Sequence, residues 1–183
     1  MTEITDPVLP SGGNAPGELR RRRFMAWLIM SLAVVALDQF TKLEVTQSLD
    51  LYQRVPVLPF FDLVRLHNSG AAFSLLAGAS GWQNWLFTGV AVVVSAGVLV
   101  WLIRLPPRGK NLLALGLALL LGGAIGNLID RLIYGYVVDF ILIYYADWSY
   151  PAFNIADSAI TCGVTLVLLD GLVLERRARP APD

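Results

Sequence analysis

The sequence predicts an all-α polytopic membrane protein with four transmembrane helices, both termini cytoplasmic, and a small extracytoplasmic β subdomain. Of its 183 residues, 56% are hydrophobic and only 15% charged, which is more apolar surface than a soluble domain of this size can bury. A bilayer-spanning helix needs roughly 20 apolar residues. Four stretches meet that requirement, at 24–44, 83–104, 111–129 and 154–174.

The basic residues predict the orientation of these spans. Most of the 14 lysine and arginine residues fall into three groups, which are Arg20–Arg23, then Arg104, Arg108 and Lys110, then Arg176, Arg177 and Arg179. With four spans, all three groups lie on one side of the membrane. Because short loops rich in Lys and Arg stay in the cytoplasm, that side is predicted to be cytoplasmic.

The segments on the cytoplasmic side are short or polar. Residues 1–23 are rich in Pro, Gly and polar residues and end in the basic block, which predicts a disordered cytoplasmic tail. The apolar run that follows continues without a small-residue cleavage site, which favours an uncleaved span over a signal peptide. Residues 105–110 form a Pro-rich cytoplasmic turn, and 175–183 form a second cytoplasmic tail.

Two longer segments lie on the outer side. Within residues 45–82, the stretch 55–74 mixes Pro, Val, Phe and Leu in a way that is typical of short strands, and it predicts the β subdomain. Residues 130–153 are dense in aromatic side chains, which suits a segment lying in the membrane interface.

Composition also argues against several classes of function. One cysteine and one histidine leave no internal disulfide and too few soft ligands for a zinc site, so neither a metal nor a cofactor is expected. The formal net charge is zero, and nucleic acid is not an expected partner. The cysteine, Cys162, is interpreted as a packing residue, and the histidine, His67, as a surface or hydrogen-bonding residue.

Ionisable residues in apolar segments are functional candidates, because they are costly unless paired or facing a watery cavity. Asp38 and Lys42 are spaced i, i+4 near the outer end of the first span, where a structural ion pair and a catalytic role are equally supported. Asn127, Asp130 and Arg131 close the third span. Their spacing of about one helical turn favours a scaffolding network.

Asp139 and Asp157 are both predicted at the outer boundary, where the chain returning from the third to the fourth span can bring them together. Two carboxylates sharing one site cannot both ionise cheaply, so one keeps its proton. The pair could then activate water and protonate a scissile peptide bond, with the individual roles unassigned. The alternative, equally open, is that Asp157 only bonds Asn154 and Asp139 only faces water.

Taken together, the polar blocks resemble the lipoprotein signal peptidase family, also called signal peptidase II. The blocks that carry the resemblance, within residues 24–174, are Asp38-Gln-Phe-Thr-Lys42, Asn68-Ser-Gly70-Ala-Ala-Phe73, Gly126-Asn127-Leu-Ile-Asp130-Arg131, Val138-Asp139-Phe140 and Phe153-Asn154-Ile-Ala156-Asp157. Five blocks in this order within a profile of four spans form a specific signal.

The resemblance implies an aspartic endopeptidase of the bacterial inner membrane that cleaves before a diacylglyceryl-modified cysteine, with its active site near the outer face. It implies that Asp139 and Asp157 are catalytic. The residues implied to bind substrate or support the pair are Asp38, Lys42, Asn68, Gly70, Asn127, Asp130, Arg131, Asn154 and Ala156. The implied partners are prolipoprotein signal peptides, membrane lipid and inhibitors of the globomycin type.

Three other functions are considered. A proton-coupled transporter could use Asp38, Asp139 and Asp157 as a relay, although a relay needs groups across the whole membrane and these cluster at one end. A serine–lysine hydrolase could use Lys42 to activate Ser69 or Ser74. A non-enzymatic scaffold would tolerate the loss of both Asp139 and Asp157.

Overall fold

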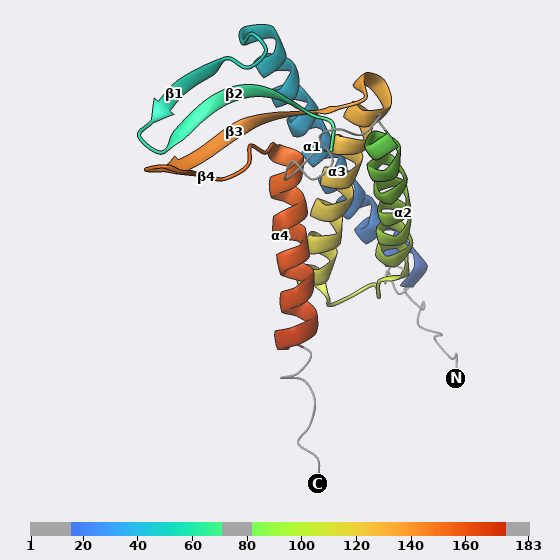
Figure 1. The fold of residues 1–183 in the computed structure, drawn as a ribbon. Coiled ribbons are helices and arrows are strands. Elements are labelled where there is room, and N and C mark those ends of the chain that lie inside the picture. The colour runs from blue at the N-terminus through green and yellow to red at the C-terminus, as the bar shows by residue number, and fades with distance from the viewer. Residues whose placement is uncertain (1–15, 71–81, 175–183) are drawn as a thin grey trace, which may run out of the picture.

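The computed structural model describes residues 16–70 and 82–174, which form four helices and a small sheet (Figure 1). The helices are α1 (Pro16–Ser48), α2 (Trp82–Arg104), α3 (Asn111–Tyr134) and α4 (Ile155–Leu169), the last continued by one π-helical turn at Asp170–Leu174. The strands are β1 (Arg54–Leu58), β2 (Phe61–Asn68), β3 (Val137–Tyr145) and β4 (Trp148–Ser149). All four helices are long and apolar enough to cross a membrane. The predicted fold class of four spanning helices with a small sheet is therefore confirmed, and the cytoplasmic placement of the termini stays a prediction.

Helix α3 forms the centre of the bundle and packs against α1, α2 and α4. Of its most apolar stretch, 61% is buried, compared with 11%, 17% and 22% in the other three helices. Glycines bring α3 and α4 together, since a Cβ on Gly116 would lie 2.9 Å from the carbonyl oxygen of Gly163. Close backbone contact at small residues is the usual way in which helices pack within lipid.

At the end of the bundle away from the sheet, polar contacts join the helices. Arg20 donates to the carbonyl oxygen of Ile103 at 2.7 Å, and Arg23 donates to that of Pro106 at 3.0 Å. Lys110 pairs with Asp170 at 3.0 Å. The basic residues that predicted the orientation therefore also tie α1 to the α2–α3 turn, and that turn to α4.

Helix α1 begins earlier than expected. The sequence placed a disordered tail at 1–23, whereas the helix starts at Pro16 and contains the whole basic block. Between Gly17 and the apolar span there is no helix breaker, and Glu, Leu and Arg are good helix formers, so the span continues toward the N-terminus. The other expectations for residues 1–15, 71–81 and 175–183 lie outside the described residues.

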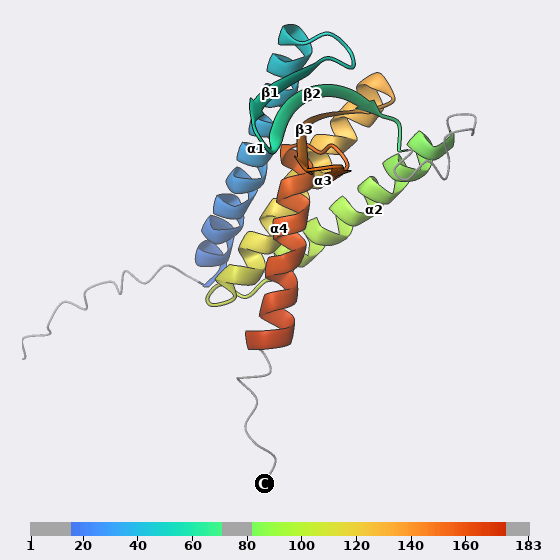
Figure 2. The same ribbon diagram turned by 60° about the vertical axis from the view of Figure 1, so that its left-hand side comes forward.

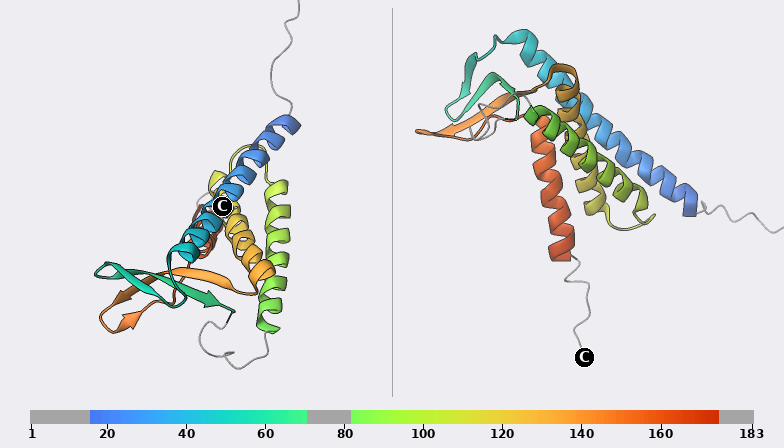
Figure 3. Two further views of the ribbon diagram at one scale, coloured as in Figure 1. Left: turned by 90° about the horizontal axis from the view of Figure 1, so that it is seen from above. Right: turned by 45° about the vertical axis from the view of Figure 1, so that its right-hand side comes forward.

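The sheet is antiparallel, with the strand order β1-β2-β3-β4. It lies over one end of the helices and extends sideways past them (Figure 3). Strands β2 and β3 pair in a register that sets Leu66 opposite Asp139 and His67 opposite Val138. At the far end of the sheet, the buried Asp62 pairs with Arg54 and accepts a hydrogen bond from the Tyr144 hydroxyl at 3.0 Å.

The segment 130–153 differs from its prediction. It was expected to be an aromatic segment lying in the interface, but α3 continues to Tyr134 and the rest contributes β3 and β4 to the sheet. The run VVDFILIYY of β3 consists mostly of β-branched and aromatic residues, which favour a half-buried pleated surface. Part of the aromatic density therefore belongs to a strand that pairs with β2, and the location of the segment in the membrane interface stays a prediction.

Candidate active site

Asp139 and Asp157 come from different elements and converge on Asn154. Asp139 lies on β3, whereas Asp157 lies in the first turn of α4. The Asn154 side chain donates to Asp139 Oδ1 at 2.9 Å, and the Asn154 backbone N–H donates to Asp157 Oδ2 at 3.1 Å. Asn154 Oδ1 accepts in return from the Asp157 backbone N–H at 2.9 Å, completing a capping box at the start of α4. The predicted contact between Asp157 and Asn154 is therefore present. Because Asn154 also bonds Asp139, it connects the two carboxylates.

The Asp139 carboxylate is almost fully buried and is held from both sides. Asp139 is 3% exposed. The Asn68 side chain donates to Asp139 Oδ2 at 2.9 Å, and Asn154 donates to the other carboxylate oxygen. Burial raises the pKa of Asp139 to about 7, and the nearby Asp157 charge adds to this rise. Asp139 is therefore close to half protonated at neutral pH.

Gly70 fixes the orientation of Asn68. Its backbone N–H donates to Asn68 Oδ1 at 2.8 Å, which leaves the Asn68 amide nitrogen pointing at Asp139. The backbone of Gly70 has a φ of 91°, in the left-handed region. A Cβ at this position would also lie 2.5 Å from the Phe87 ring. The turn after Asn68 consequently requires glycine.

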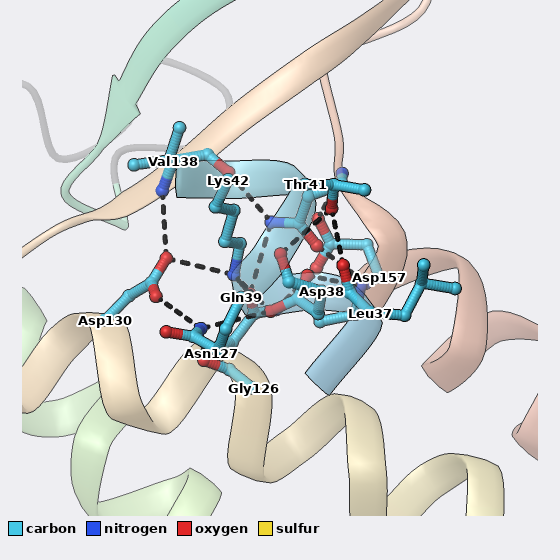
Figure 4. Close-up of polar contacts among 12 residues, drawn as sticks. Leu37, Asp38, Gln39, Thr41, Lys42, Gly126, Asn127, Asp130, Val138 and Asp157 are labelled. Atoms are coloured by element: carbon cyan, nitrogen blue, oxygen red, sulfur yellow. Dashed lines mark hydrogen bonds and ion pairs between the residues drawn. The ribbon is translucent and has the colours of Figure 1, made fainter. Parts of the chain in front are cut away.

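A second cluster surrounds Lys42 on the side of α1 (Figure 4). Lys42 Nζ lies 2.8 Å from Asp38 and 2.9 Å from Asp130, and it donates to Asn127 Oδ1 at 3.0 Å. The three charged side chains are at most 5% exposed. One lysine thus compensates two buried carboxylates, and the predicted i, i+4 contact between Asp38 and Lys42 is present.

The two carboxylates of this second cluster also hold the backbone beside Asp139 and Asp157. Asp38 Oδ1 accepts from the N–H of Ala156 at 2.9 Å, and Ala156 immediately precedes Asp157. Asp130 Oδ2 accepts from the N–H of Val138 at 3.2 Å, next to Asp139. The cluster therefore anchors α4 and β3 at the residues that carry Asp157 and Asp139.

Asn127 links the two clusters. Its Oδ1 accepts from Lys42 at 3.0 Å and from Asn154 at 3.2 Å, and its Nδ2 donates to Asp157 Oδ1 at 2.7 Å. Figure 4 shows Asn127 on α3 between Lys42 and Asp157. A continuous hydrogen-bonded network therefore runs from Lys42 on α1 to Asp157 on α4.

Arg131 lies at the edge of this network rather than within it. Its guanidinium donates weakly to the carbonyl oxygen of Asn127 at 3.4 Å and lies 5.7 Å from the centre of the Phe87 ring. Its charge interacts with those of Asp130, Asp139 and Asp157. Arg131 thus contributes a positive charge facing the carboxylates.

Sequence reasoning missed Gln39 as a member of the network. Its Nε2 donates to Asp130 Oδ1 at 2.8 Å and to the carbonyl oxygen of Gly126 at 3.1 Å. A signal was present, because Gln39 is a polar residue within an apolar span and lies between Asp38 and Lys42 in the same block. The contacts with Gly126 and Asp130 show that Gln39 faces α3.

Asp157 is half-buried and lines two hollows of about 230 Å³ each. The first lies between α2, α3 and α4, and its lining includes Phe87, Val90 and Arg131. The second is lined by Tyr150 and Phe153 and by the α4 residues that follow Asp157, including Cys162, which is exposed. In Figure 2, α2 diverges from α4 toward the end of the bundle that carries the sheet. Asp157 can therefore be approached from the side of the bundle.

Comparison with known proteins identifies the family of the chain. The profile of the family described as Signal peptidase (SPase) II matches residues 30–173. A lipoprotein signal peptidase of Acinetobacter baylyi is 51% identical over 153 residues, covering 84% of this chain and 85% of the relative. One of Pseudomonas putida is 50% identical over 161 residues, covering 87% and 94%.

Solved structures with the same fold are bacterial membrane enzymes. One, determined by the in meso method at 2.3 Å, matches with a TM-score of 0.74 and 28% identity over 86% of this chain and 93% of its own. Another, at 1.9 Å, gives a TM-score of 0.71 and 29% identity over 81% and 93%. Since the profile matches most of the sequence and these relatives align over most of their length, the chain belongs to the signal peptidase II family of membrane proteases.

Proposed function

We propose that this protein removes the signal peptide from diacylglyceryl-modified prolipoproteins, cleaving before the lipidated cysteine with Asp139 and Asp157 as the catalytic pair. Membership of the family supports a lipoprotein signal peptidase. One observation carries the mechanism: two carboxylates from separate elements converge on Asn154, and one of them opens onto a groove at the side of the bundle.

In this mechanism, Asp139 holds the shared proton and Asp157 is ionised. Asp157 removes a proton from a water molecule, and the water oxygen attacks the scissile carbonyl carbon while Asp139 donates its proton to the carbonyl oxygen. Collapse of the tetrahedral gem-diol breaks the C–N bond. The proton on Asp157 passes to the leaving amine, and one hydroxyl of the gem-diol returns its proton to Asp139, which restores the pair. The raised pKa of Asp139 supports its assignment as the acid, although the pair titrates as a unit.

The groove between α2, α3 and α4 supports a substrate that arrives from the bilayer. Its walls include apolar α2 residues such as Val90 and Val94, while Asn127, Arg131 and Asp157 supply polar groups. An apolar signal-peptide segment can pack against the walls, and the polar groups can hold its backbone. Lipid acyl chains reach this depth without leaving the membrane.

The localisation follows from the same orientation argument. We place the protein in the bacterial inner membrane with the basic groups in the cytoplasm, so the sheet and the carboxylate pair lie at the outer face. Lipid-modified precursors whose signal peptides span that membrane would present their cleavage site there. Inhibitors of the globomycin type are expected to compete for the same groove.

The rival functions have less support. The transporter is not favoured, because the family is one of proteases. A serine–lysine mechanism requires a lysine free to accept a proton, whereas Lys42 is engaged by Asp38, Asp130 and Asn127. Ser69→Ala and Ser74→Ala variants should consequently retain activity.

The decisive experiment is cleavage of a diacylglyceryl-modified prolipoprotein by the purified protein in detergent. Wild type should cut before the lipidated cysteine, and Asp139→Asn and Asp157→Asn should each lose at least about a hundredfold in kcat. Asp147→Asn, which removes an exposed carboxylate between β3 and β4, is the matched control and should cut normally. Cleavage by either dyad variant would refute the two-aspartate mechanism, and an inactive wild type would refute the function.

A further inference from the structure

A stack of aromatic rings includes His67, the residue that precedes Asn68 at the end of β2. The rings of His67 and Tyr136 are 3.7 Å apart between centroids and 15° from parallel, and Tyr134 continues the stack at 5.9 Å from Tyr136. His67 belongs to β2, whereas Tyr136 lies between α3 and β3. The stack therefore joins two segments that are distant in sequence.

The stack lies close in sequence to two residues of the candidate site. Asn68 directly follows His67 at the end of β2, and Asp139 follows Tyr136 closely on β3. Gly135, with a φ of 79°, turns the chain from α3 into β3. The stack fixes β2 relative to this turn, and with it the position from which Asn68 donates to Asp139.

The face of the His67 ring makes the contact with Tyr136. Among the described residues, nothing hydrogen-bonds His67 Nε2, although this atom is buried. Burial lowers the pKa of His67, and Arg65 lowers it further, so the ring is neutral at neutral pH. A neutral, flat ring is suited to stacking on tyrosine.

The β2–β3 ladder also holds this end of β2, through the pairs His67–Val138 and Asn68–Val137. Ser69 is exposed, and Asn68 keeps its orientation through a single turn closed by Gly70. Strand ends open more readily than strand centres. Without the stack, the Asn68 amide would spend less time within bonding distance of Asp139.

We propose that His67, by stacking on Tyr136, is a positioning residue of the active site that holds Asn68 against Asp139. This inference rests on the proposed function, because it gives His67 a task in the same cleavage reaction. It requires an aromatic ring at position 67 but not an ionisable one.

Kinetics of two substitutions test the proposal. His67→Ala should lower kcat about tenfold, the upper range for loss of one stacked aromatic pair, and change KM less than about twofold. His67→Phe keeps a ring that can stack and should remain within about threefold of wild type. Tyr145→Ala, which removes an exposed ring from the far end of β3, should not reduce kcat.

The pH profile separates positioning from general damage to the fold. Asn68 stabilises the ionised form of Asp139, so loosening its bond should raise the pKa of Asp139 and move the alkaline limb of kcat/KM to higher pH. The charges that face Asp139, namely Asp157, Lys42 and Arg131, are the same in every variant. His67→Ala should shift this limb in the same direction as Asn68→Ala, but less.

Several outcomes would overturn the proposal. They are a normal kcat and pH limb in His67→Ala, an equally impaired His67→Phe, or a lowered kcat without a shift of the limb. If His67→Ala does not fold, Tyr136→Leu removes the stack from the other side and should give the same shift. Since wild type is measured alongside, its failure to cleave refutes the proposed function, whereas normal cleavage by both stack variants refutes only this inference.

Discussion

At the scale of single residues, Asp139 combines deep burial with two amide donors. Asn68 and Asn154 favour its ionised form, yet burial and the Asp157 charge outweigh them and raise its pKa to about 7. A carboxyl group that titrates near neutrality is an effective proton donor at the pH of the cell. In the proposed mechanism, Asp139 is accordingly the acid of the pair.

This assignment predicts the pH dependence of cleavage. As the pH rises above about 7, Asp139 loses its proton, so kcat/KM should fall about tenfold per pH unit on the alkaline side. Initial rates at low substrate concentration between pH 5 and 9 measure this. A rate that stays level to pH 9 would show that Asp139 is not the proton donor.

The same shift has a consequence for stability. Because the folded-state pKa is raised above the unfolded value, the stabilising contribution of protonated Asp139 is complete below about pH 4 and is lost as the pH rises through about 7. Asp139→Asn stays neutral throughout. Its Tm should therefore decrease less between pH 5 and 8 than that of wild type.

Lys42 is predicted to act through structure. Replacing it with methionine leaves Asp38 and Asp130 buried without a cation, which should destabilise the protein by about 3–5 kcal/mol. Thermal unfolding in detergent measures the change, and Asp38→Asn combined with Lys42→Met and Asp130→Asn should recover part of it. A Lys42→Met protein of unchanged Tm but without activity would instead indicate direct chemistry.

At the scale of elements, glycines determine how closely α3 and α4 pack. A methyl group added at Gly163 would lie 2.7 Å from the carbonyl oxygen of Gly116 and 2.9 Å from the backbone of Leu120. Backbone atoms cannot move aside as a side chain can. The helices would have to separate at this contact.

Gly163→Ala is therefore expected to destabilise the protein by about 1–3 kcal/mol. Gly97→Ala on α2 is the matched control, since no atom lies within 4 Å of the added methyl group. That substitution should be neutral or stabilise by up to about 1 kcal/mol. Thermal unfolding of both variants compares them directly, and equal Tm values would contradict the close-packing argument.

At the scale of the whole molecule, the chain combines a polar network with an apolar surface. Asp38, Lys42, Asn127, Asp130 and Asn154 are all buried, while many large apolar side chains on the outsides of the helices are exposed. This is the distribution expected where lipid replaces water as the surrounding solvent. The network and the sheet lie at one end of the bundle (Figure 1).

Orientation in the membrane can be tested with cysteine labelling. Cys162 is the sole cysteine, so a Cys162→Ser background is free of thiols. In spheroplasts, a membrane-impermeant maleimide should label Tyr145→Cys on the sheet, and should label Arg108→Cys in the α2–α3 turn only after permeabilisation. The reverse pattern would invert the proposed topology and place the active site in the cytoplasm.

The sequence by itself determined the four spans, the polar groups available for chemistry and the presence of short strands in the first outer segment. Hydropathy and turn composition are local properties, so they can be detected without knowing which elements touch. Blocks such as Asp38 to Lys42 likewise marked candidate site residues before their contacts were known. The predicted start of α1 was wrong, because a helix can continue beyond the part of its sequence that spans the lipid.

Only the tertiary structure decided how these parts meet. The pairing of β2 with β3, the convergence of Asp139 and Asp157 on Asn154, and the stack of His67 on Tyr136 all join residues from separate elements. Each depends on strand register and on how closely α1, α3 and α4 pack. Such contacts arise from the folded arrangement of distant segments, and no local pattern of residues encodes them.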